Sequence, residues 1–356
     1  MTTSENVHAA VRIADREIGS GRPCFIIAEA GVNHNGSLKL ARDLIDAAAS
    51  AGADAVKFQT FSADALVTRT APKADYQERV LGNDQSQFDM LRQLELDREA
   101  HLALQSYARE RGLLFLSTPF DSASVALLGE LRVPAFKISS GDLTNHPLLE
   151  EMARLGRPMI LSTGMASLPE VEAATDAVRR AGNPPVILLQ CESRYPAEPA
   201  SANLRAMETL ARHFHVPVGY SDHTLGMEVA LAAVAMGACL LEKHLTYDRS
   251  APGPDHQASL DPAGFTALVR GVRMVEAALG DGRKEPTPAE AKTAIAARKS
   301  VVSARSIPAG ASLAAEDLAI KRPGTGFPPA QWTTLVGRIA RVAIPEGTVL
   351  TPEMLA

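Results

Sequence analysis

Short apolar runs alternate with amphipathic stretches between about residue 25 and residue 280. The apolar residues within each run are continuous rather than alternating, which is typical of parallel strands buried on both faces. Eight runs of this kind predict strands, at 24–31, 53–60, 112–120, 134–141, 157–164, 184–193, 216–224 and 237–246.

The stretches between these runs have helical periodicity. In 37–52, for example, Leu40 and Leu44 fall on one face, and the segments 167–182 and 226–237 are similar. Several of these stretches end in glycine, the usual residue at a helix C-terminus. Strict alternation of strands with helices predicts a closed (β/α)₈ TIM barrel rather than an open doubly wound sheet.

Two segments interrupt or end this pattern. Residues 61–97 form a longer connection than a barrel usually has, and we expect them to cover the site as a lid. The charged segment 281–290 contains two prolines and indicates a domain boundary. The sequence therefore predicts a barrel domain with an N-terminal extension over 1–280, a linker over 281–297 and a small β-rich domain over 298–356.

The C-terminal region contains a weak internal repeat. Residues 306–318 and 343–355 share the frame x-I-P-x-G-x-x-L followed by a closing leucine. Each copy predicts a turn, a short strand and a helical turn, which together would form a small pseudo-symmetric domain. The alternative is a chance match within a tail rich in proline and glycine.

Composition restricts the classes of function. The net charge is −5 with no basic block, which argues against a nucleic-acid partner. No stretch approaches the ~20 apolar residues of a membrane span, and the first residues lack the apolar core of a signal peptide. Cys24, Cys191 and Cys239 lie far apart in apolar runs, as small buried side chains would. We therefore expect a cytoplasmic protein with no membrane partner.

Polar side chains gather at the predicted strand ends, where the active site of an αβ barrel lies. These residues are Glu29, Lys57, Gln59, Ser117, Thr118, Lys137, Ser140, Ser162, Thr163, Gln190, Ser221, Asp222, His223, Glu242, Lys243 and His244. Apolar side chains could fill a barrel mouth equally well, so the pattern as a whole indicates an active site.

His223 and His244 are 21 residues apart, about one strand–helix unit. They should therefore lie on adjacent strand ends, where they could share a metal ion. Two imidazoles would leave coordination positions open for water and substrate, which suits a Lewis acid. The alternative is a pair of hydrogen-bonded structural histidines.

Lys57 and Lys137 project from strands into the predicted interior, where a lysine is costly unless it is paired or functional. They could form a Schiff base or bind an anion. Hydroxyl groups around the same mouth favour a phosphate or carboxylate clamp, namely those of Thr118, Ser140, Ser162 and Ser221. Structural salt bridges with Glu29 or Glu242 are the alternative. Glu29 could also act as a base or orient water.

Two further residues lie in rigid turns. Asp255 belongs to the segment 252–256 after the eighth strand, where it could cap the site and bind hydroxyl groups or simply form a surface turn. Arg322 lies in the segment 321–326 of the small domain, and there an ordinary surface loop is an equal alternative.

In these motifs the chain resembles the sialic acid (nonulosonic acid) synthases. The motifs are IIAEAGVNHNG (26–36), KFQT (57–60), STPF (117–120), KISSGD (137–142), LSTGM (161–165), YSDHTLG (220–226), EKHLT (242–246), PGPD (252–255) and KRPGTG (321–326). The C-terminal region is similar to the antifreeze-like (SAF) domain of that family. The resemblance implies an enzyme that condenses phosphoenolpyruvate with N-acetylmannosamine or a related amino sugar and releases phosphate to give a nine-carbon nonulosonic acid.

The resemblance also implies roles for individual residues. His223 and His244 would bind a divalent ion, usually manganese, with magnesium or cobalt as alternatives. Phosphoenolpyruvate would be held by Lys57, Thr118, Lys137, Ser140, Ser162 and Ser221. The sugar or water side would be lined by Glu29, Gln59, Tyr195 and Asp255. A domain-swapped homodimer is implied, in which Arg322 reaches the acyl group of the substrate in the partner's site.

The choice of sugar stays open. Members of the family that use N-acetylmannosamine tend to have an Asn-x-Tyr pattern, whereas this chain has Ser193-Arg194-Tyr195. Family members that make legionaminate or pseudaminate use 2,4-diacetamido-2,4,6-trideoxyhexoses instead. A phosphorylated sugar would need a second phosphate clamp, and no further arginine-rich strand end is visible. A non-catalytic carbohydrate-binding or ice-binding protein would have no use for the cationic mouth.

Overall fold

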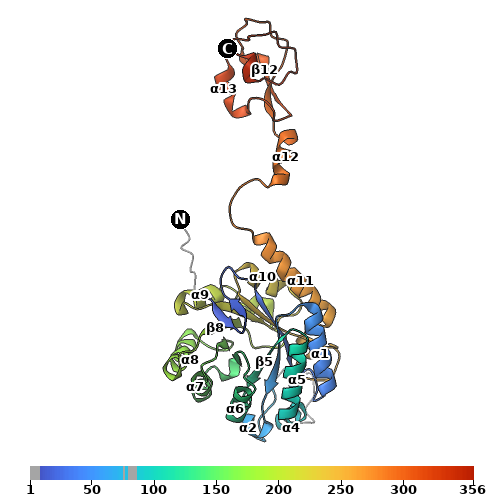
Figure 1. The fold of residues 1–356 in the computed structure, drawn as a ribbon, viewed down its shortest axis with the longest axis vertical. Coiled ribbons are helices and arrows are strands. Elements are labelled where there is room, and N and C mark those ends of the chain that lie inside the picture. The colour runs from blue at the N-terminus through green and yellow to red at the C-terminus, as the bar shows by residue number, and fades with distance from the viewer. Residues whose placement is uncertain (1–8, 75–76, 79–85) are drawn as a thin grey trace. The chain divides into compact units, whose positions relative to one another are not determined.

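The computed structural model describes residues 9–74, 77–78 and 86–356 (Figure 1). The chain divides into two compact units, Met1–Gly280 and Asp281–Ala356, and each is described by itself. Within the described ranges, no helix is both long and apolar enough to cross a membrane.

The first unit contains all eight predicted strands in one parallel sheet. They are β3 (Phe25–Gly31), β4 (Ala55–Thr60), β5 (Leu114–Pro119), β6 (Phe136–Ile138), β7 (Met159–Ser162), β8 (Val186–Cys191), β9 (Val218–Asp222) and β10 (Leu240–His244). The strand order is β5-β4-β3-β10-β9-β8-β7-β6, and β5 also lies against β6. The sheet thus curls into a nearly closed barrel, which confirms the predicted TIM-barrel fold.

The predicted helices surround these strands (Figure 1). They are α1 (Leu38–Ala51), α5 (Arg98–Glu110), α6 (Ser122–Glu130), α7 (His146–Arg154), α8 (Leu168–Ala181), α9 (Ala206–Phe214), α10 (Glu228–Ala235) and α11 (Pro262–Leu279). The hydroxyl of Ser37 caps the start of α1 by accepting from the N–H of Leu40. Gly52 ends α1 with a φ of 82°, a conformation that glycine adopts without steric cost.

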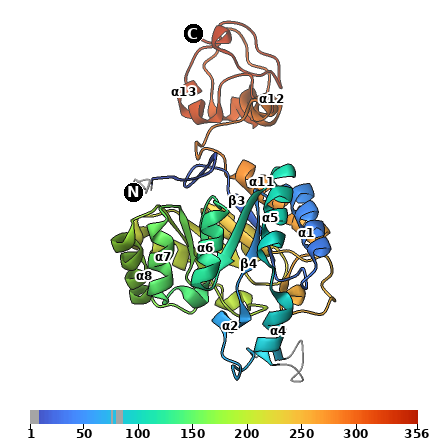
Figure 2. The same ribbon diagram turned by 60° about the horizontal axis from the view of Figure 1, so that its bottom comes forward.

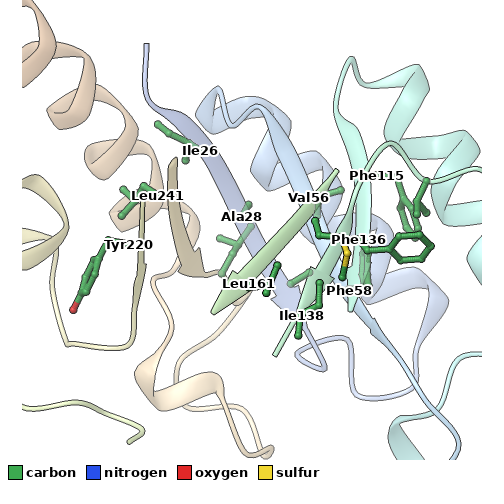
Figure 3. Close-up of a cluster of buried hydrophobic side chains, with 14 of the residues drawn as sticks. Ile26, Ala28, Val56, Phe58, Phe115, Phe136, Ile138, Leu161, Tyr220 and Leu241 are labelled. Atoms are coloured by element: carbon green, nitrogen blue, oxygen red, sulfur yellow. The ribbon is translucent and has the colours of Figure 1, made fainter. Parts of the chain in front are cut away.

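The apolar residues form two cores because successive strand side chains point to opposite faces. One set packs outward against the helices and includes Ile26, Val56, Tyr220 and Leu241 (Figure 3). The other set fills the barrel interior and includes Phe25, Ile27, Ala55, Leu116, Ile160, Ile187, Leu189 and Leu240.

An N-terminal hairpin closes the amino end of the barrel. Strands β1 (Val11–Ile13) and β2 (Arg16–Ile18) pair antiparallel. Their side chains Val11, Ile13 and Ile18 are buried in the interior core. The sequence indicated only an extension here, since two three-residue strands are too short to give a periodic signal.

Two short helices, α2 (Ala63–Leu66) and α4 (Gln87–Leu94), lie against each other in the long connection after β4. Figure 2 shows them at the end of the barrel opposite the β1–β2 hairpin. Phe61, Met90 and Leu94 form a small core there with Val32. Parts of the predicted lid, residues 75–76 and 79–85, lie outside the described residues.

The second unit contains α12 (Pro288–Ala297), β11 (Ser300–Ser303), β12 (Leu318–Lys321) and α13 (Trp332–Leu335). Its sequence repeat is also a structural repeat. Ile307 and Ile344, which occupy equivalent positions, exchange two backbone hydrogen bonds of 2.8 Å. Each copy ends in a 3₁₀ turn, Ala315–Asp317 in the first and Pro352–Met354 in the second. The predicted pseudo-symmetry is therefore present.

Candidate active site

A cavity of about 480 Å³ lies at the carboxyl ends of the barrel strands. Its lining includes every predicted site residue of the first unit: Glu29, Lys57, Gln59, Thr118, Lys137, Ser140, Ser162, Tyr195, Ser221, His223, His244 and Asp255. The fold thus brings together side chains that are separated by up to 226 residues, from Glu29 to Asp255.

Not every polar strand end faces this cavity. Asp222 and Lys243 pair with each other, and Ser117 bonds to Thr60. The amide of Gln190 donates to the carbonyl oxygen of Ala202. Because side chains alternate along a strand, these residues point outward while their neighbours point inward. Polarity alone does not distinguish inward-facing from outward-facing residues. Their positions along each strand do, because every second residue from an interior apolar residue also faces inward.

Lys57 lies among acceptors inside the barrel. Its Nζ is 2.7 Å from Glu29 Oε2, 3.7 Å from Glu242 Oε2 and 3.0 Å from the hydroxyl of Thr118. Burial would lower the pKa of Lys57, but Glu242 and Glu29 outweigh it and raise that pKa. Lys57 is therefore an ammonium ion in the unliganded site.

Lys137 lies across the same cavity. Its Nζ donates to Ser162 Oγ at 2.8 Å and lies 3.3 Å from Glu242 Oε1. Burial lowers its pKa more than Glu242 raises it. The amino group of Lys137 is thus placed both to bind an anion in the cavity and to form a salt bridge with Glu242.

Glu242 connects the two lysines, a role that the sequence offered only as an alternative. Its Oε1 also accepts a hydrogen bond of 2.9 Å from the hydroxyl of Ser221. Burial would raise the pKa of Glu242, but Lys137 and Lys57 hold it at about 2. The spacing Glu242-x-His244 could have revealed it, because both residues must then share the interior face of β10.

Glu29 differs from Glu242 in its charge. Burial raises the pKa of Glu29 to about 7 despite the opposing effect of Lys57. Its Oε1 accepts a hydrogen bond of 3.3 Å from the amide of Gln59. A carboxyl group that titrates near neutrality can both accept and return a proton.

His223 is held at both ring nitrogens. Its Nδ1 lies 2.6 Å from the carbonyl oxygen of Glu192, and its Nε2 lies 2.8 Å from the hydroxyl of Tyr195. Cys191 Sγ lies 3.8 Å from Nδ1. Burial lowers the pKa of His223, but Cys191 and the Glu192 carbonyl outweigh it and raise the pKa. A carbonyl acceptor at Nδ1 fixes that proton and turns Nε2 toward the cavity, as in many metal-binding histidines.

His244 lies beside it, with 5.5 Å between the two ring centroids. Its buried Nδ1 has no hydrogen-bond partner within the described residues and lies 3.9 Å from Asp255 Oδ2. Burial and the neighbouring His223 keep the pKa of His244 well below its usual value. Burial also raises the pKa of Asp255 to about 6.

The two imidazoles suit a shared divalent ion. His244 is neutral and carries an unpartnered buried nitrogen, while His223 has a ring orientation fixed by Glu192. No group of three His, Cys, Asp or Glu side chains with metal-binding geometry occurs in the described part of the chain. A metal here would therefore take its remaining ligands from water and substrate.

Serine residues line one wall of the cavity. Ser140 Oγ accepts a hydrogen bond of 3.0 Å from the N–H of Gly164. Ser193 Oγ is buried without a hydrogen-bond partner, and an added Cβ on Gly164 would come within 2.2 Å of it. A larger residue at position 164 would therefore force the Ser193 side chain to move. The sequence noted Ser193 only as a departure from a family pattern.

The cavity lining also contains many apolar side chains, together with the polar Gln77 and Gln87. The apolar residues are Val32, Leu66, Val67, Met90, Leu91, Leu94, Phe120, Met165 and Pro254. Several of these belong to the long connection after β4, so the described parts of that connection border the cavity.

Arg322 belongs to the second unit. It follows β12 and is exposed, and its peptide bond to Pro323 is cis. Its predicted role is not tested by the geometry of the second unit.

Comparison with known proteins agrees with the motifs. The model of the NeuB family matches residues 44–284, and that of the SAF domain matches residues 298–356. The chain is 47% identical to N,N'-diacetyllegionaminic acid synthase of Legionella pneumophila, covering 94% of this chain and 95% of that protein. It is 39% identical to N-acetylneuraminate-9-phosphate synthase of Mus musculus, covering 95% of this chain and 94% of that protein.

A solved structure with the same architecture is the N-acetylneuraminic acid synthetase of Leptospira borgpetersenii in complex with citrate. It superposes with a TM-score of 0.71 at 36% identity, covering 81% of this chain and 96% of that one.

Proposed function

Because this chain belongs to the NeuB family of sialic-acid-type synthases, we propose that it condenses phosphoenolpyruvate with an N-acetylated amino sugar to form a nine-carbon nonulosonic acid. The observation that carries this proposal is the pair of buried lysines that face one cavity among hydroxyl groups. The proposal extends the family assignment to a substrate and to the roles of individual residues.

Lys57 and Lys137 would bind the anionic groups of phosphoenolpyruvate. Each amine already contacts a hydroxyl group, that of Thr118 or that of Ser162. These contacts pre-orient the two amino groups toward the cavity, so little rearrangement is needed when an anion enters. Ser140 and Ser221 add hydroxyl groups on the same wall. This arrangement supports an anion clamp over a Schiff base, since Lys57 is charged in the free site.

The reaction then requires one carbon–carbon bond, one water and one leaving group. The enol carbon of phosphoenolpyruvate attacks the aldehyde carbon of the open-chain sugar, and positive charge develops at the carbon that bears the phosphate oxygen. Water adds to that carbon, and the proton that it loses passes to the alkoxide formed from the aldehyde oxygen. The resulting tetrahedral intermediate collapses to the ketone and expels inorganic phosphate, which carries away the hydroxyl proton. Glu29, whose pKa is about 7, would accept the proton of this water. Gln59 would orient the Glu29 carboxylate, and Lys57 would stabilise the departing phosphate.

His223 and His244 would hold a divalent ion, with manganese preferred over magnesium or cobalt. When bound, it would supply a Lewis acid for the aldehyde oxygen of the sugar. Tyr195 and Asp255, which lie beside the two imidazoles, would bind hydroxyl groups of the sugar there.

Two observations favour a 2,4-diacetamido-2,4,6-trideoxyhexose as the sugar. The chain is 47% and 46% identical to diacetyllegionaminic acid synthases of two bacteria. The cavity lining also contains many apolar side chains, among them Leu66, Met90 and Leu94, which suit a methyl terminus and an acetamido methyl better than a charged phosphate. N-acetylmannosamine is the competing substrate.

Phosphate release tests the proposal directly. The full-length protein with manganese and phosphoenolpyruvate should release phosphate when a 2,4-diacetamido-trideoxyhexose is added, and mass spectrometry should find the nine-carbon acid. Faster turnover of N-acetylmannosamine would change the assigned sugar and keep the reaction. No phosphate release with any member of an amino-sugar panel would overturn the reaction itself.

A further inference from the structure

A fully enclosed ion pair lies at the ends of β9 and β10. Lys243 Nζ is 2.7 Å from Asp222 Oδ2, and the exposed fraction of both side chains is 0%. Lys243 also donates to the carbonyl oxygen of Thr224 at 2.5 Å. Asp222 Oδ1 accepts from the N–H and the hydroxyl of Thr224, at 2.9 and 2.8 Å. No step of the proposed reaction uses this pair.

The pair lies directly behind the two histidines. Asp222 and Lys243 are register partners on β9 and β10, and each immediately precedes one of the imidazole residues in the chain. Since side chains alternate across a strand, the histidines face the cavity while the pair faces the helix layer. Tyr220 and Leu241, two residues earlier on the same faces, belong to the outer core (Figure 3).

Stability alone does not account for charges at this place. Apolar side chains occupy the preceding outward positions of both strands, Tyr220 and Leu241. Replacing a buried ion pair by apolar residues of similar size is often neutral or stabilising, because two desolvated charges are costly. The pair therefore calls for another role.

Its position in the register indicates that role. The pairing of β9 with β10 runs from Leu241↔Tyr220 to Lys243↔Asp222, so the ion pair lies at its last step. His223 and His244 come one residue beyond that step. The side-chain bond and the contacts to Thr224 extend the connection between the two strands to the point where the histidines begin.

We propose that Asp222 and Lys243 are positioning residues whose ion pair holds the ends of β9 and β10 together and so sets the separation of the His223 and His244 imidazoles for one divalent cation. This inference rests on the proposed function, because it takes the two histidines as metal ligands. Side chains that orient metal ligands from behind typically change metal affinity by about 10- to 100-fold when they are replaced.

The test is the double variant Asp222→Asn with Lys243→Met, which removes both charges together. Either single variant would leave an uncompensated buried charge, so the double variant is the cleaner change. We expect the affinity of the metal-free protein for Mn²⁺, measured by electron paramagnetic resonance titration, to fall at least about tenfold. The thermal midpoint without metal should stay close to that of the wild type. Turnover should recover at saturating Mn²⁺ while the metal requirement rises.

A matched control removes an ion pair near the other end of the same barrel. Arg273 Nη2 lies 3.2 Å from Asp54 Oδ2, at the amino ends of β3 and β4. The double variant Asp54→Asn with Arg273→Met also removes one charge of each sign, together with the pairs that Arg273 makes with Glu276 and that Asp54 makes with Arg16. Its Mn²⁺ affinity should equal that of the wild type.

Unchanged Mn²⁺ affinity in the folded Asp222→Asn, Lys243→Met protein would overturn the inference. Should that variant not fold, Thr224→Val replaces it, since it removes only one hydrogen bond to Asp222. We then expect a smaller loss of Mn²⁺ affinity, about threefold, and no loss would equally overturn the inference. If the His223→Ala variant binds Mn²⁺ as tightly as the wild type, the metal assignment under the proposed function is contradicted, and the inference falls with it.

Discussion

The ammonium group of Lys57 lies 2.7 Å from Oε2 of Glu29, and both side chains are buried inside the barrel mouth. Glu29 nevertheless has a raised pKa of about 7, because burial outweighs the nearby cation. The other carboxylate near Lys57, that of Glu242, has a pKa of about 2. Of the two carboxyl groups beside Lys57, one thus stays ionised and the other exchanges a proton near neutrality. Pairs whose environments separate their pKa values in this way are typical of acid–base sites.

The pH dependence of turnover should report Glu29. If its carboxylate accepts the proton of the attacking water, it must be ionised, so kcat/KM should rise as the pH increases through about 7. Glu29→Gln should lower kcat by at least about a hundredfold, the usual contribution of a general base. The residual kcat/KM of that variant should no longer rise as the pH increases through about 7. If kcat/KM of Glu29→Gln still rises through pH 7, another group is responsible for that rise.

Lys57 and Lys137 should act without forming an imine. Lys57→Met and Lys137→Met should each weaken the use of phosphoenolpyruvate more than that of the sugar, because each removes a cation from the anion clamp. Borohydride added with both substrates should trap no covalent adduct, as judged by the intact mass of the protein. A trapped adduct on either lysine would replace the clamp with Schiff-base chemistry.

Removal of the divalent ion should stop the reaction. After treatment with a chelator, phosphate release should disappear, and manganese should restore it. His223→Ala should lose both turnover and stoichiometric Mn²⁺ binding, because one of two imidazole ligands is gone. His213→Ala is a suitable control, since that histidine lies on α9 and is partly exposed. Full activity in exhaustively chelated protein would contradict the metal assignment.

Acid should destabilise the barrel through its buried histidines. Burial lowers the pKa values of His34 and His256 to about 4, well below that of an unfolded histidine near 6.5. The unfolded chain therefore binds more protons between these values, and stability is lost as the pH falls from about 6.5 to about 4. Each group can contribute up to about 3 kcal/mol to this loss.

Thermal unfolding between pH 4 and pH 7 measures this effect. His34→Asn removes one titrating group, so its thermal midpoint should depend less steeply on pH, although its stability at pH 7 will be lower. A slope equal to that of the wild type would show that His34 does not contribute.

Complementation tests the proposed exchange of the second unit between two copies. Lys57→Ala destroys a barrel site, and Arg322→Ala removes the guanidinium that the family resemblance places in the partner's site. Co-expression of the two variants should give up to about a quarter of wild-type activity, because half of the randomly paired dimers keep one complete site. No gain over either parent, in a sample shown to contain mixed dimers, would rule out action in trans.

The barrel itself could be read from the sequence. Continuous apolar runs followed by amphipathic helices predicted each strand from β3 to β10, because strands that are buried on both faces cannot carry alternating polar residues. The cavity was equally predictable, since parallel strands place their carboxyl ends at one end of a barrel. The two copies of x-I-P-x-G-x-x-L likewise predicted a pseudo-symmetric small domain, since equal local patterns form equal local structures, and the structure adds the pairing of Ile307 with Ile344.

Only the tertiary structure determined which charged residues face the cavity and how their pKa values differ. Glu242 and Lys243 are adjacent in the sequence and equally polar, yet one joins two lysines in the cavity and the other is enclosed behind it. The pKa values of Glu29 and Glu242 also differ although both are buried glutamates. Two lysines lower the pKa of Glu242, whereas mainly Lys57 acts to lower that of Glu29 and the charge of Glu242 raises it. Such differences depend on distances between strands that are far apart in the chain. Local pattern therefore determined the fold and the position of the site, whereas the side-chain geometry determined which groups carry charge and which of them meet.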